Sequence, residues 1–214
     1  MNMRSPTIST IILALALAPQ AIIGQTASRI AQPVILDVAD DGYHLTSVAD
    51  GVRFDLNSDG IVEQLAWTSR ASDDAFLAID ENRNGRIDDG SELIGGPLGP
   101  PNGIYALSAF DGFATAADLS RAANRHADGH IDPSDEIFRR LLLWTDSNHN
   151  GISEEPELES VAHAGFVKIY LRITVISQFD SYGNLFYSEG AASLRNSYGV
   201  EVNRRMTTVR LQGQ

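Results

Sequence analysis

The chain has 214 residues, of which 28 are acidic and 16 are basic, and it has no cysteine. This length fits one domain, or one domain with an appendage, and is sufficient to bury a hydrophobic core. The formal charge of −12 disfavours nucleic-acid binding and attraction to anionic lipid, because both need clustered Lys and Arg. The absence of cysteine excludes disulfides, thiolate zinc sites and cysteine nucleophiles.

The N-terminus is typical of a secretory signal peptide. Arg4 supplies a positive charge, and the apolar run 11–18 (IILALALA) is short for a membrane span. We therefore expect a secreted protein (extracellular, cell-surface or periplasmic) with no membrane span after cleavage; an uncleaved anchor is the alternative. The expected organisation is a signal peptide at 1–24, a linker at 25–32 and a domain at 33–214.

Five acidic segments repeat one loop pattern. Oxygen-bearing side chains stand at or near positions 1, 3 and 5, and glycine stands at position 6. Ca²⁺ binds six to eight oxygens, and such a loop supplies them from positions 1, 3, 5, 7 (a backbone carbonyl), 9 and 12. Because the chain has no disulfides, bound extracellular calcium would stabilise the fold in their place. The segments are 37–42 (DVADDG), 55–60 (DLNSDG), 80–85 (DENRNG), 124–129 (NRHADG) and 146–151 (DSNHNG).

The last segment fits the calcium pattern best, with an acid at position 12. Apolar residues precede it and a helical pattern follows, so helix–loop–helix is the natural interpretation. Ser153 occupies position 8, which is usually apolar in an EF-hand, and this puts the usual short β-bridge to a partner loop in doubt. The predicted ligands are Asp146, Asn148, Asn150, the carbonyl of Ile152, and Glu157.

The segment that begins at residue 80 is nearly as good. Its position 12 is Ser91, and the acid comes one residue later, so we predict a thirteen-position variant in which Gly90 absorbs the extra residue. The predicted ligands are Asp80, Asn82, Asn84, the carbonyl of Arg86, Asp88 and Glu92.

The segment that begins at residue 55 lacks the closing acid, because its position 12 is Ala66. Its flanks resemble strands, so a metal-free hairpin turn rich in Asn, Asp and Gly is an equal alternative. The candidate ligands are Asp55, Asn57, Asp59 and Glu63.

The two remaining segments depart from the pattern. Asn124 and His126 replace the expected residues at positions 1 and 3 of the fourth segment, which leaves Asp128, Asp132 and Asp135 as candidate ligands of a weak site. The first segment has Ala39 at position 3 and no later acid, so we expect a plain turn at 37–42.

The pattern of elements predicts an α+β fold. Short strands at 34–37, 43–47, 52–55, 61–68 and 75–79 suggest an N-terminal antiparallel meander that carries calcium loops. Helices are expected at 104–110, 114–123, 133–144 and 156–164, the last two flanking the best loop as a central EF-hand-like pair. Strands at 167–176, 185–189 and 200–211, with a turn at 180–184, predict a C-terminal hairpin or small sheet. The expected divisions are 33–94, 95–103 (a Gly/Pro-rich break), 104–165 and 166–214.

Longer motifs resemble a family of bacterial secreted EF-hand-like calcium-binding domains that also occur in hemolysin-type exported proteins. The resemblance covers roughly residues 33–187, and it is carried by DDGSEL, LLLWTDSNHNG and the C-terminal FDSYGNLF turn. It implies calcium binding and an extracellular setting without catalytic activity. Ala39, Asn124 and His126 depart from the usual pattern of that family.

Three functional hypotheses follow. The first is a secreted calcium-binding protein whose ions mainly stabilise the fold and present a surface to an extracellular or cell-surface protein or polysaccharide. The second is a dockerin-like adhesion or interaction module built on the loops of 124–157; an exposed apolar face on the helix 133–144 would favour it, and burial of that face would count against it. The third, a hydrolase with structural calcium, is less favoured because the acids are explained by loop spacing and no His or Ser motif is found. We expect no enzyme activity.

Overall fold

A computed structural model describes residues 30–97, 103–111 and 127–213. Within these residues almost all regular structure is β. The strands are β1 (Val34–Leu36), β2 (Val52–Phe54), β3 (Glu63–Leu65), β4 (Ala75–Ala78), β5 (His130–Ile131), β6 (Leu142–Trp144), β7 (Leu158–Ser160), β8 (Phe166–Tyr170), β9 (Thr174–Phe179), β10 (Leu185–Arg195) and β11 (Glu201–Arg210). The helices are α1 (Gly103–Ser108) and three single turns of 3-10 helix at Gly90–Glu92, Glu136–Arg139 and Glu155–Glu157.

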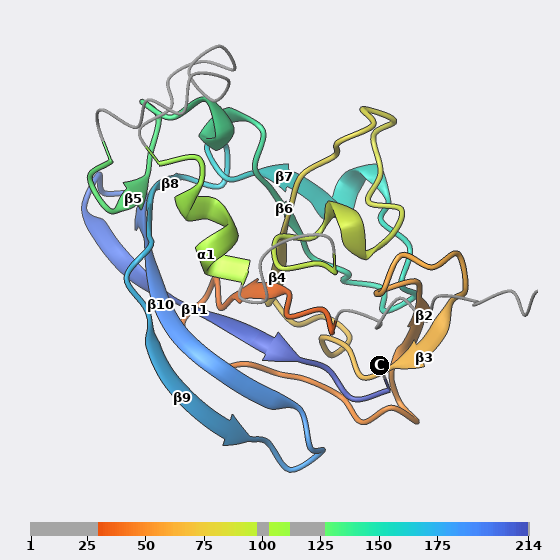
Figure 1. Cartoon of the computed structure of the whole chain (residues 1–214). Helices are drawn as coiled ribbons and strands as arrows, with labels where there is room; N and C mark the ends of the chain where they lie inside the picture. Colours follow the sequence, from red (N-terminus) through yellow and green to blue (C-terminus); the bar gives the residue numbers. More distant parts are fainter. Residues whose placement is uncertain (1–29, 98–102, 112–126, 214) are drawn as a thin grey trace, which may run out of the picture.

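One antiparallel sheet of nine strands organises the described part of the chain. Its order is β5-β8-β10-β11-β1-β4-β6-β7, and β9 pairs with the first half of β10. The first strand therefore lies between the last strand and β4, with Val34 opposite Thr208. β2 and β3 form a separate two-stranded ribbon, which lies away from the long β10–β11 hairpin in Figure 1.

The central strands are buried on both faces. Side chains alternate across a strand, and here the alternation sends neighbours into two different hydrophobic clusters. Val34 and Leu36 of β1 join one cluster, in which the residues of α1 pack, while Ile35 joins the other. β2 and β3 cover this second face with Val52, Phe54 and Leu65.

An aromatic group fills the second cluster between the sheet and the β2–β3 ribbon. Trp67 lies 4.4 Å from Phe76 and 5.5 Å from Trp144, measured between ring centroids, and Phe54 contacts both tryptophans at 5.2 and 5.4 Å. All four side chains are buried. Tilted aromatic pairs at these distances stabilise a core beyond the area that they bury.

The predicted central helix pair is wrong, and with it the α+β class. Residues 133–144 form one 3-10 turn followed by β6, and residues 156–164 form the end of another 3-10 turn, β7 and a turn. A short apolar run such as RLLLW fits a doubly buried strand as well as a helix, so periodicity alone could not decide. Pairing with β4 and β7 decides for strand, because Leu143 then faces one cluster and Trp144 the other.

The predicted N-terminal meander is also wrong in its pairing. β1 and β4 do lie near their predicted positions, but they pair with each other and with distant strands, and residues 43–47 contribute only the isolated bridge Leu45–Thr68. The C-terminal strands belong to the large sheet rather than to a small sheet of their own. Pairing partners of this kind are set by contacts between segments far apart in the sequence, which local patterns do not reveal.

Some predictions fall on residues outside the described ranges. These are the signal peptide 1–24, most of the linker 25–32 and the helix 114–123. Among the helices of the described residues, none is both long and apolar enough to span a bilayer.

Candidate metal centre

Three loops share one hydrogen-bond framework around their first aspartate. One oxygen of this carboxylate accepts a hydrogen bond from the amide of position 5, and the other accepts from the glycine amide of position 6. The distances are 3.1 and 2.8 Å for Asp55, 3.1 and 2.8 Å for Asp80, and 3.0 and 2.9 Å for Asp146. The first carboxylate therefore closes each loop and is held in a fixed orientation.

The backbone of each loop makes the sharp turn that this framework needs. Position 4 has a positive φ in all three, at 57° for Ser58, 61° for Arg83 and 61° for His149. The glycine at position 6 also has a positive φ, which only glycine adopts readily. His149 is held further by its ring, whose two nitrogens lie 2.7 Å from the carbonyl oxygens of Thr68 and Asp50.

An acid at position 9 completes the ring of side chains in each loop. Glu154 accepts hydrogen bonds from the amide groups of Asn148 (3.1 Å) and Asn150 (2.8 Å). Asp88 and Glu63 play the same part, and their partners are Asn82 and Asn84 for Asp88 and Asn57 for Glu63. Glu154 is not among the ligands predicted from the sequence, although position 9 belongs to the calcium-loop pattern. The signal was present, since Glu63, Asp88 and Glu154 all lie at the same offset from the first aspartate.

The closing acids fold back over two of the loops. Glu157 accepts from the Ser147 hydroxyl at 3.0 Å and the Asn148 amide at 3.2 Å, and Glu92 accepts from the amides of Glu81 and Asn82 at 3.0 and 3.4 Å. Both glutamates are buried. Gly90 and Glu92 lie in the single 3-10 turn that brings the Glu92 side chain back to these amides.

The loop at residue 55 has no closing acid of its own and is hydrogen-bonded to the neighbouring loop at residue 80 instead. The Gly90 amide donates to the Asp55 carbonyl at 2.8 Å, and the Ser58 hydroxyl donates to Asp89 at 2.9 Å. The carboxylates of Asp55, Asp59 and Glu63 offer oxygens within 4.8 Å of one another. Oε2 of Glu63 is buried and has no hydrogen-bond partner among the described residues.

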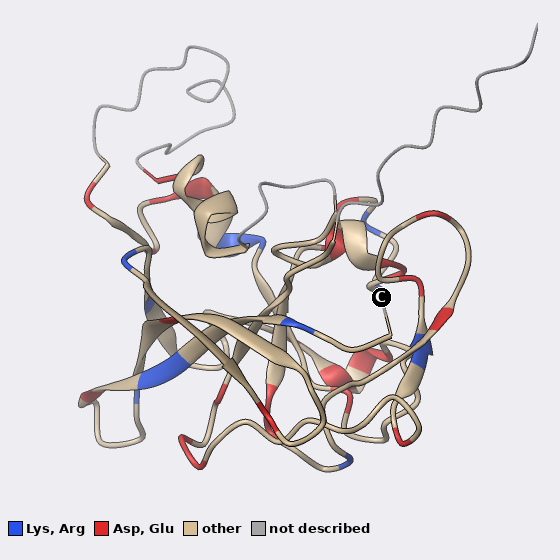
Figure 2. Cartoon of the chain, turned by 60° about the horizontal axis from the view of Figure 1, so that its bottom comes forward, with Lys and Arg blue, Asp and Glu red and all other residues tan. Residues whose placement is uncertain are grey.

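The pKa of two acids in these loops is raised above its ordinary value. Burial raises the pKa of Glu63, and the Asp59 charge raises it further. Burial also raises the pKa of Glu157, with the adjoining Glu154 carboxyl as the next cause, whereas the hydrogen bond from Asn150 lowers the pKa of Glu154. In both raised cases burial is the first cause and a neighbouring carboxyl is the next. Figure 2 shows that Asp and Glu lie mainly in such loops rather than along the strands.

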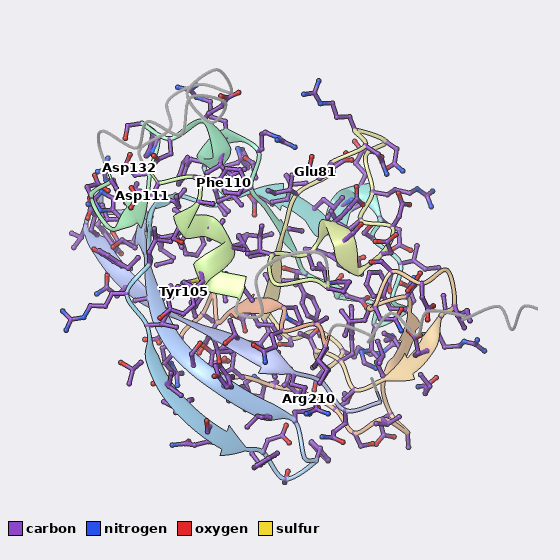
Figure 3. The ribbon with its side chains drawn as sticks, in the orientation of Figure 1. Glu81, Tyr105, Phe110, Asp111, Asp132 and Arg210 are labelled. Atoms are coloured by element: carbon purple, nitrogen blue, oxygen red, sulfur yellow. The ribbon has the colours of Figure 1, made fainter. Side chains whose placement is uncertain are left out.

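The fourth loop is completed by a residue that the sequence did not suggest. Asp111 accepts from the Asp128 amide at 3.1 Å with one oxygen and from the Gly129 amide at 3.0 Å with the other. This is the position-1 framework of the other loops, with Asp128 at position 5 and Gly129 at position 6. Figure 3 shows Asp111 beyond α1 and close to Asp132. Asn124, the predicted first position, lies outside the described residues.

The remaining positions of the fourth loop also follow the pattern. The Asp132 amide donates to Asp135 at 2.9 Å, as the position-9 amide donates to the closing acid in the loops that end at Glu92 and Glu157. His130 lies between two acids, with Nδ1 3.0 Å from Asp128 and Nε2 3.2 Å from Asp132. Burial would raise the pKa of Asp132, but hydrogen bonds from Ser134 and the nearby His130 outweigh it and lower that pKa.

The first segment forms the turn that was expected at 37–42. The Asp37 carboxylate accepts from the amides of Asp40, Asp41 and Gly42 at 2.7–3.1 Å. It also lies 2.7 Å from Arg205 of β11, so this acid is paired with a basic side chain, whereas among the described residues the first aspartates of the other loops have no such partner.

Comparison with known proteins identifies the family of the chain. Residues 34–205 match the family described as "SPM domain". The chain is also similar to "Iron-regulated protein FrpA" of Neisseria meningitidis serogroup C, with 30% identity over 161 residues. That similarity covers 74% of this chain but only 14% of the relative, so the chain corresponds to a small part of a much longer protein. The matched residues contain β1, the loops at 55, 80 and 146 and the first half of β11, and the chain belongs to the SPM domain family.

Proposed function

We propose that this chain is a calcium-binding module that acts outside the cell, and that its ions mainly stabilise the fold. The observation that carries the proposal is the framework shared by the loops at 55, 80 and 146. In each of these loops the position-1 carboxylate accepts from the amides of positions 5 and 6, and the position-9 acid accepts from the Asn side chain of position 3.

The donor set fits calcium better than other metals. The side chains of these loops are carboxylates and Asn amides, whose oxygens Ca²⁺ prefers, whereas zinc prefers nitrogen and sulfur and magnesium retains its waters. In the loop at 146 the amides of Asn148 and Asn150 face Glu154 as hydrogen-bond donors. A cation among these oxygens would take over the neutralisation that the amide N–H groups now supply, and it would give Oε2 of Glu63 the partner that it lacks in its own loop.

The ions would act at the ends of core strands. Asp55 directly follows β2, and Asp80 and Asp146 come two residues after β4 and β6. Calcium in these loops would therefore fasten the strands that carry Phe54, Phe76 and Trp144 of the aromatic group. In a chain without cysteine this is the part that disulfides play in many exported proteins.

The fourth loop supports a further site, which Asp111 would open and Asp135 would close. Its carboxylates fit the same ion, although His130 brings nitrogen atoms among the acids at this loop. We propose it as a calcium site of different composition from the other three.

The interface alternative, a dockerin-like helix pair, finds no support in the described residues. It needed an exposed apolar face over residues 133–144, but Ile137, Phe138 and Leu143 are buried in the main cluster. We therefore do not propose this function.

The test is a thermal melt combined with an ion count. EDTA should lower the melting temperature, and Ca²⁺ should restore it more effectively than Mg²⁺ at equal concentration. In a calcium titration of the mature chain, Asp80→Ala and Asp146→Ala should each remove about one ion, because each removes the position-1 ligand. A melting curve that is the same in EDTA and in calcium, with no bound ion, would refute the proposal.

A further inference from the structure

The first loop contains a cation supplied by the protein itself. Nη2 of Arg205 lies 2.7 Å from Oδ2 of Asp37, and Nε lies 3.2 Å from Oδ1 of Asp40. The Asp37 side chain is completely buried, so its charge needs a partner inside the protein. The same guanidinium lies over the Tyr43 ring, 5.8 Å from its centroid.

This loop has the backbone of the calcium loops. Asp40 at position 4 has φ 68° and Gly42 at position 6 has φ 113°, and the Asp37 carboxylate accepts from the amides of Asp41 and Gly42 at 3.1 and 2.9 Å. The side chain missing at position 3 is replaced from another segment, since the Ala39 amide donates to Asp73. Asp37, Asp41 and Asp73 thus offer oxygens within 4.8 Å of one another.

β11 fixes Arg205 at this point. The backbone carbonyl of Arg205 accepts a hydrogen bond from the Asp37 amide at 3.1 Å, and Arg205 is paired with Ala191 of β10. Burial alone would lower the pKa of Arg205, but the carboxylates of Asp37 and Asp40 outweigh it and raise that pKa, so the guanidinium stays charged. A fixed charge at this place removes the need for an ion and repels one that approaches.

We propose that Arg205 is the resident cation of the first loop and excludes metal from Asp37, Asp41 and Asp73. The inference rests on the proposed function for the contrast with the other loops, but the pair of Asp37 and Arg205 can be tested without it. It predicts a division of the molecule: the loops at 55, 80 and 146 depend on calcium, whereas the junction of β1 with β11 is held at any calcium concentration.

Native mass spectrometry of the mature chain in calcium tests the exclusion. Arg205→Met should bind one more Ca²⁺ than the wild type, while Asp37→Asn should bind the same number as the wild type. Arg204→Met is the matched control, because Arg204 is the adjacent base and donates to the Val38 carbonyl rather than to a carboxylate, so its ion count should not change. An unchanged count for Arg205→Met, or a lost ion in Asp37→Asn, would overturn the inference.

Thermal melts in EDTA test the pair independently of any bound ion. Asp37→Asn and Arg205→Met should each lower the melting temperature by several degrees, and the double variant should lose less than the sum, because each single change leaves one charge without its partner. Additive losses would overturn the inference. If the wild type binds no ion at all, the proposed function fails, and non-additive losses in EDTA would still support the Asp37–Arg205 pair. If Arg205→Met does not fold in EDTA, Arg205→Gln, which also removes the charge, replaces it in the same cycle, with the same two outcomes.

Discussion

Ser153 and Ile87 exchange two hydrogen bonds across neighbouring loops. The Ile87 amide donates to the Ser153 hydroxyl oxygen at 2.7 Å, and that hydroxyl donates to the Ile87 carbonyl at 3.3 Å. Both residues stand at position 8 of their loops, where the sequence had put a backbone bridge in doubt. The serine side chain makes these two hydrogen bonds in place of a backbone β-bridge, and it links the loops at 80 and 146 directly.

Ser153→Ala should therefore separate these two loops. It leaves the buried Ile87 amide without a partner, which costs about 1–3 kcal/mol of unfolding free energy. We expect lower stability in urea and weaker cooperativity between the two proposed calcium sites in a calorimetric titration. Ser181→Ala is the control, because Ser181 is exposed in the turn before β10 and should change neither quantity. A variant with the stability and cooperativity of the wild type would contradict the link.

Asp111→Asn should remove one bound calcium ion. Asp111 is the residue whose two oxygens hold the Asp128 and Gly129 amides, so it occupies the first position of the fourth loop. Asn124→Ala should leave the ion count unchanged, although Asn124 is the first residue of the sequence pattern. Native mass spectrometry of both variants counts the bound ions. An ion lost in Asn124→Ala but retained in Asp111→Asn would show that Asn124, and not Asp111, is the first ligand of this loop.

Glu154→Gln should weaken calcium binding at the best loop by about tenfold, because it removes a carboxylate charge from the ring of ligands. Glu155→Gln makes the same change at the next residue, which stands at position 10 and outside that ring, and it should have little effect. A calcium titration of both variants provides the comparison. Equal affinities for the two would show that position 9 is not a ligand in this loop.

Asp74→Asn should alter how stability depends on pH. Burial raises the pKa of Asp74 above its ordinary value, and the charges of Asp73 and Asp37 add to this effect, while hydrogen bonds from Ser72 and His44 oppose it. At a pH between the unfolded and the folded pKa, the folded wild type therefore binds this proton more tightly than the unfolded chain does. This contribution to stability is present below the unfolded pKa and is lost as the pH rises through the folded pKa.

The check is a set of melts in EDTA from pH 4 to pH 7. Relative to Asp74→Asn, the wild type should become more stable as the pH falls across the acidic end of this range. A constant difference between the two proteins would mean that Asp74 has the same proton affinity in the folded and unfolded states.

The loops could be predicted from the sequence because their geometry is local. The carboxylate of Asp80 or Asp146 contacts amides only four and five residues away, so the spacing of acids, Asn and Gly specifies the turn. Asp111 could not be found in this way, because residues 112–127 separate it from the rest of its loop. The only local sign was an acid directly after a helical segment.

The sheet could not be predicted, because its pairings are long-range. β1 fits the predicted strand, yet nothing near Ile35 in the sequence indicates Phe76 or Thr207 as its neighbours. The segment of β6 was ambiguous for another reason. Leu142, Leu143 and Trp144 are consecutive apolar residues, which a helix and a strand buried on both faces accept equally well.

The place of β1 between β11 and β4 also sets the order in which the protein can fold. During synthesis β1 is made early. It cannot form its hydrogen bonds with β11 until residues 201–210 have been made, because Val34 pairs with Thr208. Contacts of such sequence separation slow folding. The loops at 55, 80 and 146, whose proposed ligands are close in sequence, would then bind calcium before β11 is made, and β11 would afterwards bring Arg205 to the loop at 37.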